Sequence, residues 1–229
     1  MALLHNGQLL DDHRIVPRQH NQLVLQMIDS LLQRAQVSRA ALEGVVFGAG
    51  PGSFTGLRIA AGVAQGIAYG LNLPVLPLSS LAALAVSARM SGPSAALNKA
   101  ASGMILTTVR ARPGELYRGL YQITGPAPEA LRLVDTEAVL APQDVVVPER
   151  SPTEALYLVG DAWSELPNAL LQASGVETLA DVWPSAAALL RLSERCWDAE
   201  ARAEPEAALP RYLQPQLPWR KLGEQQSGN

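Results

Sequence analysis

The sequence of 229 residues contains one cysteine and three histidines, which limits the kinds of site it can form. With Cys196 alone, the chain can form neither an intramolecular disulfide nor a cysteine metal cage, and the apolar periodicity around this residue favours a packed thiol over a nucleophile. The histidines, His5, His13 and His20, lack the i, i+4 spacing of a helical zinc site. We therefore predict no metal and no cofactor.

Charged side chains are also sparse. They make up 17% of the chain, the net charge is −3, and the eighteen basic residues are mostly arginines scattered along the sequence. This balance argues against strong, independent binding to nucleic acids. Acidic pairs such as Asp11-Asp12 fall in polar loops, and no nucleophile, base and orienting group occur together. The residues alone therefore predict no catalytic centre.

A signal peptide and a membrane-spanning run are lacking as well. No basic segment precedes an apolar run with a cleavage site, and the most apolar helix that we expect has only about 14 residues. Hydrophobic residues nevertheless make up 48% of the chain, which is ample for a core. We expect a globular protein of the cytosol.

The most distinctive stretch runs from Val45 to Gly70, where a short apolar strand leads through a Gly-rich loop into a helix. The loop lacks the lysine of a Walker motif, the glycine spacing of a dinucleotide fingerprint and the glycine before a nucleophilic serine. The remaining interpretation is a turn that starts the helix, with Ser53 or Thr55 as its N-cap. The residues of this loop motif are Gly50, Pro51, Gly52, Ser53, Phe54, Thr55 and Gly56.

Two helices carry apolar residues on more than one side. In the helix that follows the loop, Gly62, Gly66 and Gly70 recur every four residues and form a strip without side chains on one face. Each glycine inside a helix costs about 1 kcal/mol relative to alanine, so we expect a compensating close approach by another backbone. The stretch from Asn21 to Ala35 also predicts a helix with two apolar faces, for which burial in the core alone is an equal alternative.

The remaining patterns predict an α/β chain in two parts. Apolar runs and turn signals indicate the following elements: a hairpin over 1–10 that the stretch 13–16 could extend; strands over 75–78, 104–109, 116–124, 131–139, 156–159 and 176–182; and helices over 80–90, 163–174 and 184–203. The stretch 91–103 is small and polar and is interpreted as a linker. We therefore predict domains at 1–102 and 103–229.

The run from Gly50 to Ile59, GPGSFTGLRI, resembles the signature of the TsaB (YeaZ) family, the glycoprotease-like subunit of the tRNA threonylcarbamoyladenosine machinery. The resemblance extends in order along nearly the whole chain, at 17–28, 74–81, 112–117, 155–163 and 209–213. The resemblance implies two RNase H-like domains of the actin-like ATPase and sugar-kinase superfamily. Members of this family begin with an Ile/Leu-rich strand ending in aspartate, so we expect the first domain to lack its usual first strand.

The resemblance also implies a function and partners. It implies a non-catalytic scaffold that pairs with TsaD, is joined by the ATPase TsaE, contacts tRNA only through the complex, and could form a homodimer through the same helices. The implied docking residues are Leu23, Met27, Leu31, Arg58, Gly62, Gln65, Gly66 and Tyr69. The alternatives are an ATP-binding small-molecule kinase of the same fold, which needs the acidic residue of the absent strand, and a peptidase, for which no triad is present.

Overall fold

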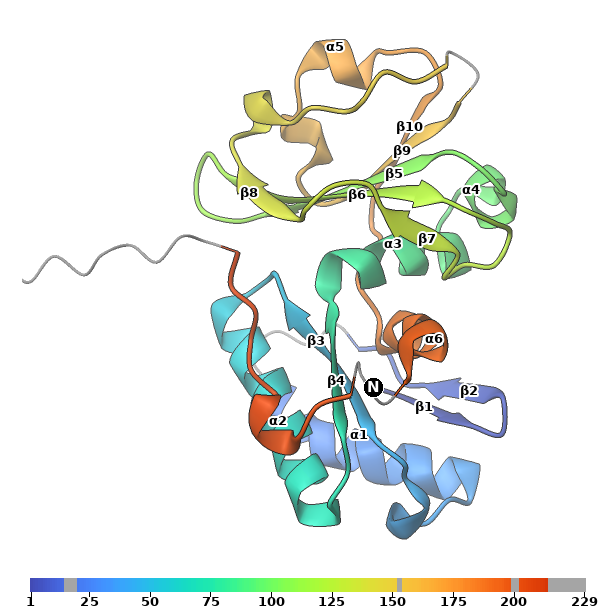
Figure 1. The fold of residues 1–229 in the computed structure, drawn as a ribbon, viewed down its shortest axis with the longest axis vertical. Helices are drawn as coiled ribbons and strands as arrows, with labels where there is room; N and C mark the ends of the chain where they lie inside the picture. Colours follow the sequence, from blue (N-terminus) through green and yellow to red (C-terminus); the bar gives the residue numbers. More distant parts are fainter. Residues whose placement is uncertain (15–19, 152–153, 199–201, 214–229) are drawn as a thin grey trace, which may run out of the picture.

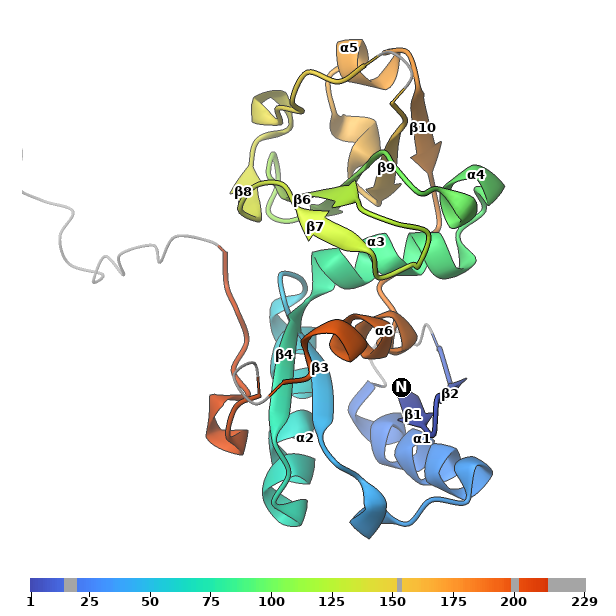
Figure 2. The ribbon, with the colours of Figure 1, turned by 45° about the vertical axis from the view of Figure 1, so that its right-hand side comes forward.

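The computed structural model describes residues 1–14, 20–151, 154–198 and 202–213, and it shows a mixed α/β fold in two lobes. The lower lobe in Figure 1 contains strands β1 to β4 with helices α1, α2 and α6, and the upper lobe contains the larger sheet. Helix α3 (Ser80–Ser91) lies between them, as Figure 2 shows from another side. The predicted α/β class is confirmed.

The lower lobe begins with the predicted hairpin. Strands β1 (Ala2–His5) and β2 (Gln8–Asp11) pair antiparallel around Asn6 and Gly7, which have positive φ angles of 49° and 75°. These angles are those of a type I′ turn, for which Asn-Gly is the preferred pair. Strand β2 ends at Asp11, so His13 and Arg14 do not extend it; residues 15 and 16 lie outside the described part of the chain.

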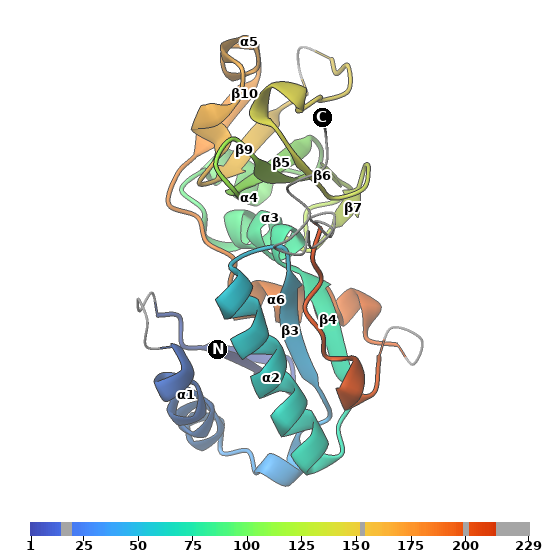
Figure 3. The same ribbon diagram turned by 90° about the vertical axis from the view of Figure 1, so that its left-hand side faces the viewer.

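The Gly-rich stretch forms the predicted strand, loop and helix. Strand β3 (Val45–Gly50) pairs in parallel with β4 (Val75–Ser79), and helix α2 (Phe54–Leu71) returns across one face of the pair. The small residues Ala61, Ala64 and Ala68 of α2 pack closely on Phe47 and Ala49 of β3. Figure 3 looks onto α2 beside α1 (His20–Ala35), while α6 (Ala186–Cys196) covers the opposite face.

The strands of the lower lobe form two separate pairs rather than one sheet. Among the strands of the described residues, β1 pairs only with β2, and β3 pairs only with β4. A cavity of about 720 Å³ separates β1 from β3, with walls that include Leu3, Leu31, Val46 and Leu190. The facing edges of β1 and β3 therefore have no strand partner in the described chain. The absence of a usual first strand stays a prediction.

The upper lobe is built on a mixed six-stranded sheet. Its order is β10-β9-β5-β6-β7, with the short strand β8 also paired to β6. The strands are β5 (Met104–Arg110), β6 (Leu116–Ile123), β7 (Leu131–Leu133), β8 (Ala138–Leu140), β9 (Leu156–Gly160) and β10 (Val176–Leu179). Ile105 faces α3 and Leu106 faces the outer cluster around Leu166, as alternation along a strand requires.

Helix packing crosses the predicted boundary at residues 102 and 103. Helix α3, which precedes the boundary, contacts β5 and β6, whereas α6, which follows it, contacts β1 to β4. Helices α3 and α6 pack on each other through Val86 and Ala188, and Ser185 donates its backbone N–H to Ser87 Oγ at 3.1 Å. The domain limits therefore stay a prediction.

Several element bounds differ from those predicted. The expected linker contains a helical turn, α4 (Ala95–Lys99), capped by Ser94, because the buried Leu97 anchors it. Helix α6 ends at Cys196 rather than near residue 203, and the stretch 163–174 forms only two short pieces, η3 (Trp163–Glu165) and α5 (Asn168–Leu171). The expected strand over 131–139 is divided into β7 and β8. Short 3-10 turns at Arg39–Ala41, Pro142–Asp144 and Pro205–Ala207 complete the elements.

Candidate docking surface and polar clusters

The loop between β3 and α2 is shaped by its first glycine and its serine. Gly50 has a φ of 123°, and a Cβ there would lie 2.6 Å from the carbonyl oxygen of Arg211. Glycine is therefore required both by conformation and by space. Ser53 is the N-cap, since its hydroxyl accepts a hydrogen bond from the Gly56 N–H at 3.4 Å. The C-terminal segment covers this end of β3, where the Arg211 N–H donates to the Ala49 carbonyl at 2.7 Å.

The outer face of α2 is smooth and uncovered. Gly62, Gly66 and Gly70 are exposed, and a Cβ placed at any of them would meet nothing of the described chain within 4 Å beyond the neighbouring backbone of its own helix. Of the implied docking residues on this helix, Arg58, Gly62, Gly66 and Tyr69 are exposed and Gln65 is half-buried. The structure therefore places all five on one helix, beside a strip that the chain leaves open.

Helix α1 presents a different apolar residue from those implied by the resemblance. Met27 and Leu31 are buried against the lobe, and Leu23 is half-buried. Leu25, which was not among the implied docking residues, is 63% exposed. Both predicted apolar faces of α1 thus contribute buried side chains, Leu31 and Met27, and the exposed apolar side chain of this helix is Leu25.

An aromatic stack lies at the N-terminal end of α2. The ring centroids of Phe54 and Tyr212 are 5.7 Å apart, and the Arg58 guanidinium lies 3.6 Å from the Phe54 centroid. Phe54 is 56% exposed and Tyr212 is 47% exposed. Figure 3 shows the orange-red C-terminal segment passing beside this end of the helix. Tyr212 was not predicted as a site residue, because the stack joins segments far apart in the sequence.

A shared carboxylate joins the two lobes. Glu137 Oε1 accepts a hydrogen bond from the Tyr121 hydroxyl at 2.5 Å and another from the Ser79 hydroxyl. Ser79 also caps α3, since its Oγ accepts the N–H groups of Leu81 and Ala82 at 3.1 Å each. Burial, followed by the Glu137 charge, raises the pKa of Tyr121 well above its usual range. The cluster holds a neutral tyrosine against a carboxylate that the loop before β8 supplies.

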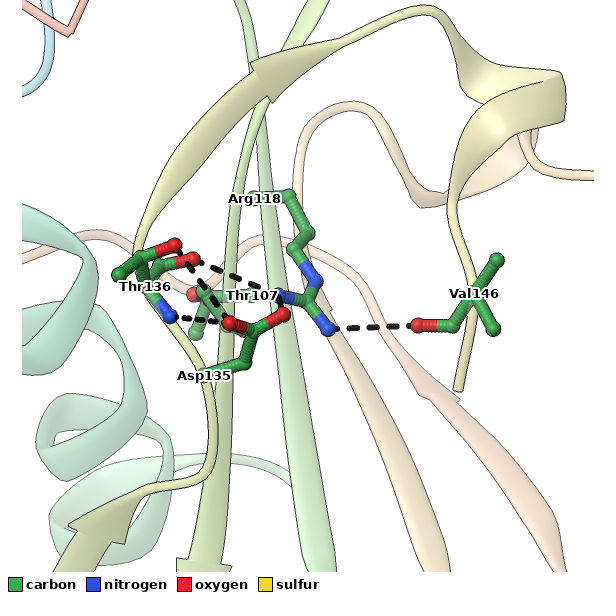
Figure 4. A network of polar contacts seen from close by, with 6 residues as sticks. Thr107, Arg118, Asp135, Thr136 and Val146 are labelled. Carbon is green, nitrogen blue, oxygen red and sulfur yellow. Dashed lines mark hydrogen bonds and ion pairs between the residues drawn. The ribbon is translucent and has the colours of Figure 1, made fainter. Parts of the chain in front are cut away.

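On the opposite face of the same sheet, a buried arginine binds two segments that lie outside the strands. Figure 4 shows its contacts. Arg118 of β6 donates to Asp135 Oδ2 at 3.3 Å, to the Thr136 carbonyl at 3.5 Å and to the Val146 carbonyl at 3.3 Å. The Thr136 N–H, and after it the Arg118 charge, lower the pKa of Asp135. These contacts tie two irregular segments to the sheet, and they include no nucleophile.

The described residues offer little further chemistry. They contain no group of three or more His, Cys, Asp or Glu side chains that could hold a metal ion. Cys196 is half-buried, its thiol donates to the Leu192 carbonyl at 3.3 Å, and burial raises its pKa. This environment fits the predicted packed thiol, because a raised pKa leaves little thiolate at neutral pH.

No helix in the described ranges has the length and apolar character needed to cross a membrane.

Comparison with known proteins identifies the family. The sequence profile described as "TsaD: tRNA N6-adenosine threonylcarbamoyltransferase" matches residues 14–201. The chain is 31% identical over 225 residues to the tRNA threonylcarbamoyladenosine biosynthesis protein TsaB of Escherichia coli K12, covering 97% of this chain and 92% of that protein. The chain belongs to the TsaB (YeaZ) family.

Two further relatives agree with this assignment. The TsaB protein of Haemophilus influenzae is 27% identical, with 97% of this chain and 91% of that protein covered. The solved structure of YeaZ from Pseudomonas aeruginosa superposes with a TM-score of 0.79 at 36% identity, covering 93% of this chain and 92% of that one. The predicted resemblance is therefore confirmed over nearly the whole chain.

Proposed function

We propose that this chain is a non-catalytic scaffold of the enzyme complex that transfers a threonylcarbamoyl group to the adenosine beside the anticodon of tRNA. Membership of the TsaB family supports the pathway. The structural observation that supports a scaffold role is the open strip of Gly62, Gly66 and Gly70 on α2. A helix that keeps three glycines on its exposed face gives up intrinsic stability, which a closely packed partner helix would restore.

The proposed partner is TsaD, which would dock on the face formed by α1 and α2. The two helices contact each other and lie side by side in Figure 3. Leu25 of α1 and Tyr69 of α2 are large side chains exposed on these helices, and they would surround the glycine strip. An exposed apolar surface next to a close-approach strip is typical of a helix-to-helix interface. TsaE would join this pair, and a homodimer would use the same face.

The accessory role is supported by the chemistry of the polar clusters. Glu137 and Asp135 each bind protein hydroxyl, amide or guanidinium groups, so both carboxylates serve structural contacts. The Gly-rich loop lies against the carbonyl of Arg211, which leaves little room for a phosphate on that side of Gly50. None of these contacts supports the alternative that the chain is an ATP-binding kinase. The proposed compartment is the cytosol, where tRNA is modified.

A co-purification experiment with the cognate TsaD protein tests this proposal. Gly66→Leu places a bulky side chain on the open strip and should abolish co-purification, whereas Ala96→Leu on the exposed side of α4 should leave it unchanged. Gly66→Ala adds one methyl group and should weaken binding only slightly. Because the strip faces open space, the Leu variant should stay folded, which circular dichroism would verify. Wild-type levels of TsaD with folded Gly66→Leu would contradict the proposed docking face.

A further inference from the structure

The described arginines differ in whether their guanidinium groups are paired. Every other described arginine donates a hydrogen bond or pairs with a carboxylate, but the guanidinium groups of Arg58 and Arg211 do neither. Arg58 contacts the Phe54 ring, and Arg211 precedes Tyr212 in the chain. The two uncompensated guanidinium cations among the described residues thus occur on the two segments that form the aromatic stack.

The stretches that supply the stack carry no acidic side chain, and the nearest acidic residue of the C-terminal segment, the exposed Glu206, lies in the 3-10 turn Pro205–Ala207, which contacts α2. Residues 45–71 and 207–213, which supply the stack, contain no aspartate or glutamate, although the whole chain has a net charge of −3. The two segments of the stack therefore combine two exposed aromatic rings with two guanidinium groups that have no carboxylate partner among the described residues. This composition favours an anionic ligand that also has flat rings.

We propose that Phe54, Arg58 and Tyr212 form a stacking platform for an unpaired base of RNA. The platform rests on the proposed function, because the RNA would be the tRNA that the complex modifies. Aromatic rings and guanidinium planes are the surfaces on which proteins stack single-stranded bases. An exposed ring face accepts any base, and Arg58 and Arg211 would meet the neighbouring phosphates.

The position of the platform suits such a role. It lies at the N-terminal end of α2, and Arg58 is one turn before Gly62, so it borders the proposed docking face. An RNA loop held there would lie at the edge between this chain and the transferase. With one stack and two arginines the affinity of this chain alone would be low, in keeping with the scattered basic residues of the sequence.

A binding experiment on the complex tests the platform. The probe is a fluorescein-labelled, unmodified anticodon stem-loop, titrated into the complex of this chain with TsaD and, separately, into this chain alone. Tyr212→Ala should weaken binding roughly tenfold, whereas Tyr212→Phe, which keeps the ring, should bind within about twofold of wild type. Trp183→Ala removes another exposed aromatic ring, outside the platform segments, and should have no effect. A fully paired duplex of equal length should bind more weakly than the stem-loop.

The outcomes separate the platform from the docking face. Unchanged stem-loop binding by Tyr212→Ala would overturn the proposal, and so would a duplex that binds as tightly as the stem-loop. If Tyr212→Ala instead loses TsaD while this chain alone binds RNA as wild type does, the stack is a protein contact and the proposal is wrong. If wild type fails to bind TsaD, the scaffold proposal fails, and the titration of this chain alone still decides whether the platform binds RNA.

Discussion

Ser79 and Glu137 are separated by 58 positions in the sequence, yet the Ser79 hydroxyl donates a hydrogen bond to the Glu137 carboxylate. Ser79 ends β4 and caps α3 in the lower lobe, and the same carboxylate accepts the Tyr121 hydroxyl from the upper sheet. One side chain therefore links both lobes at the start of the helix that lies between them.

Replacing Glu137 by alanine should destabilise the fold. The buried Tyr121 hydroxyl would lose its acceptor, and an unsatisfied buried polar group costs about 1–3 kcal/mol. Urea denaturation of Glu137→Ala should show a lower midpoint with an unchanged slope. Glu149→Ala, at an exposed loop position, is the control and should change the free energy of unfolding by less than about 0.5 kcal/mol. Equal stability of the two variants would show that the shared carboxylate has no structural role.

The raised pKa of Tyr121 predicts a loss of stability in alkaline solution. Its pKa in the folded state lies above the unfolded value of about 10, so its contribution is complete below that pH and is lost as the pH rises through the folded pKa. Between about pH 8 and pH 11 the wild type should therefore lose more stability than Tyr121→Phe. Denaturation midpoints at both pH values measure the difference. Tyr69→Phe, an exposed substitution, should follow the wild type.

Among the described arginines, Arg89 should be the one whose replacement lowers the stability of the fold most. Its side chain is 1% exposed and donates hydrogen bonds to the carbonyls of Ala100, Gly125 and Ala127 at 2.6–2.8 Å. Arg89→Met would leave the carbonyls of Ala100 and Gly125 without a donor, whereas that of Ala127 would keep the Ala130 N–H, so we expect a loss of about 2–3 kcal/mol and a melting temperature lower by roughly 5–10 °C. Calorimetry against Arg132→Met, an exposed change on β7, tests this. A similar melting temperature for both variants would contradict it.

Two glycine-to-alanine changes should shift the stability of the chain in opposite directions. Gly62 is helical, and a Cβ at this position would meet nothing of the described chain within 4 Å beyond the neighbouring backbone of its own helix, so Gly62→Ala should stabilise the chain by about 0.5–1 kcal/mol. Gly50 has a φ of 123° and the Arg211 carbonyl 2.6 Å from its Cβ position, so Gly50→Ala should destabilise it. Thermal denaturation of the isolated chain measures both. A destabilised Gly62→Ala would show that the strip is already covered within this chain or by a second copy.

Local patterns predicted most elements because each depends on nearby residues. The hairpin over 1–10, a helix cap at Ser53 or Thr55 and the strand at Val45 were all expected, and the structure has the hairpin, the Ser53 cap and the strand. The failures occur where distant contacts decide. Leu97 anchors a helical turn in a stretch that looked like a linker, and Asp135 interrupts an expected strand by pairing with Arg118.

The sequence by itself determined the family, the α/β class and the glycine strip, because short motifs and helical spacing are properties of adjacent residues. Only the tertiary structure decided that Met27 and Leu31 face the core, that Leu25 faces out, and that Glu137 joins the two lobes. It also brought Tyr212 onto Phe54, which no spacing could indicate. Burial and long-range pairing depend on how elements pack, and a periodic pattern identifies an apolar face without telling what covers it.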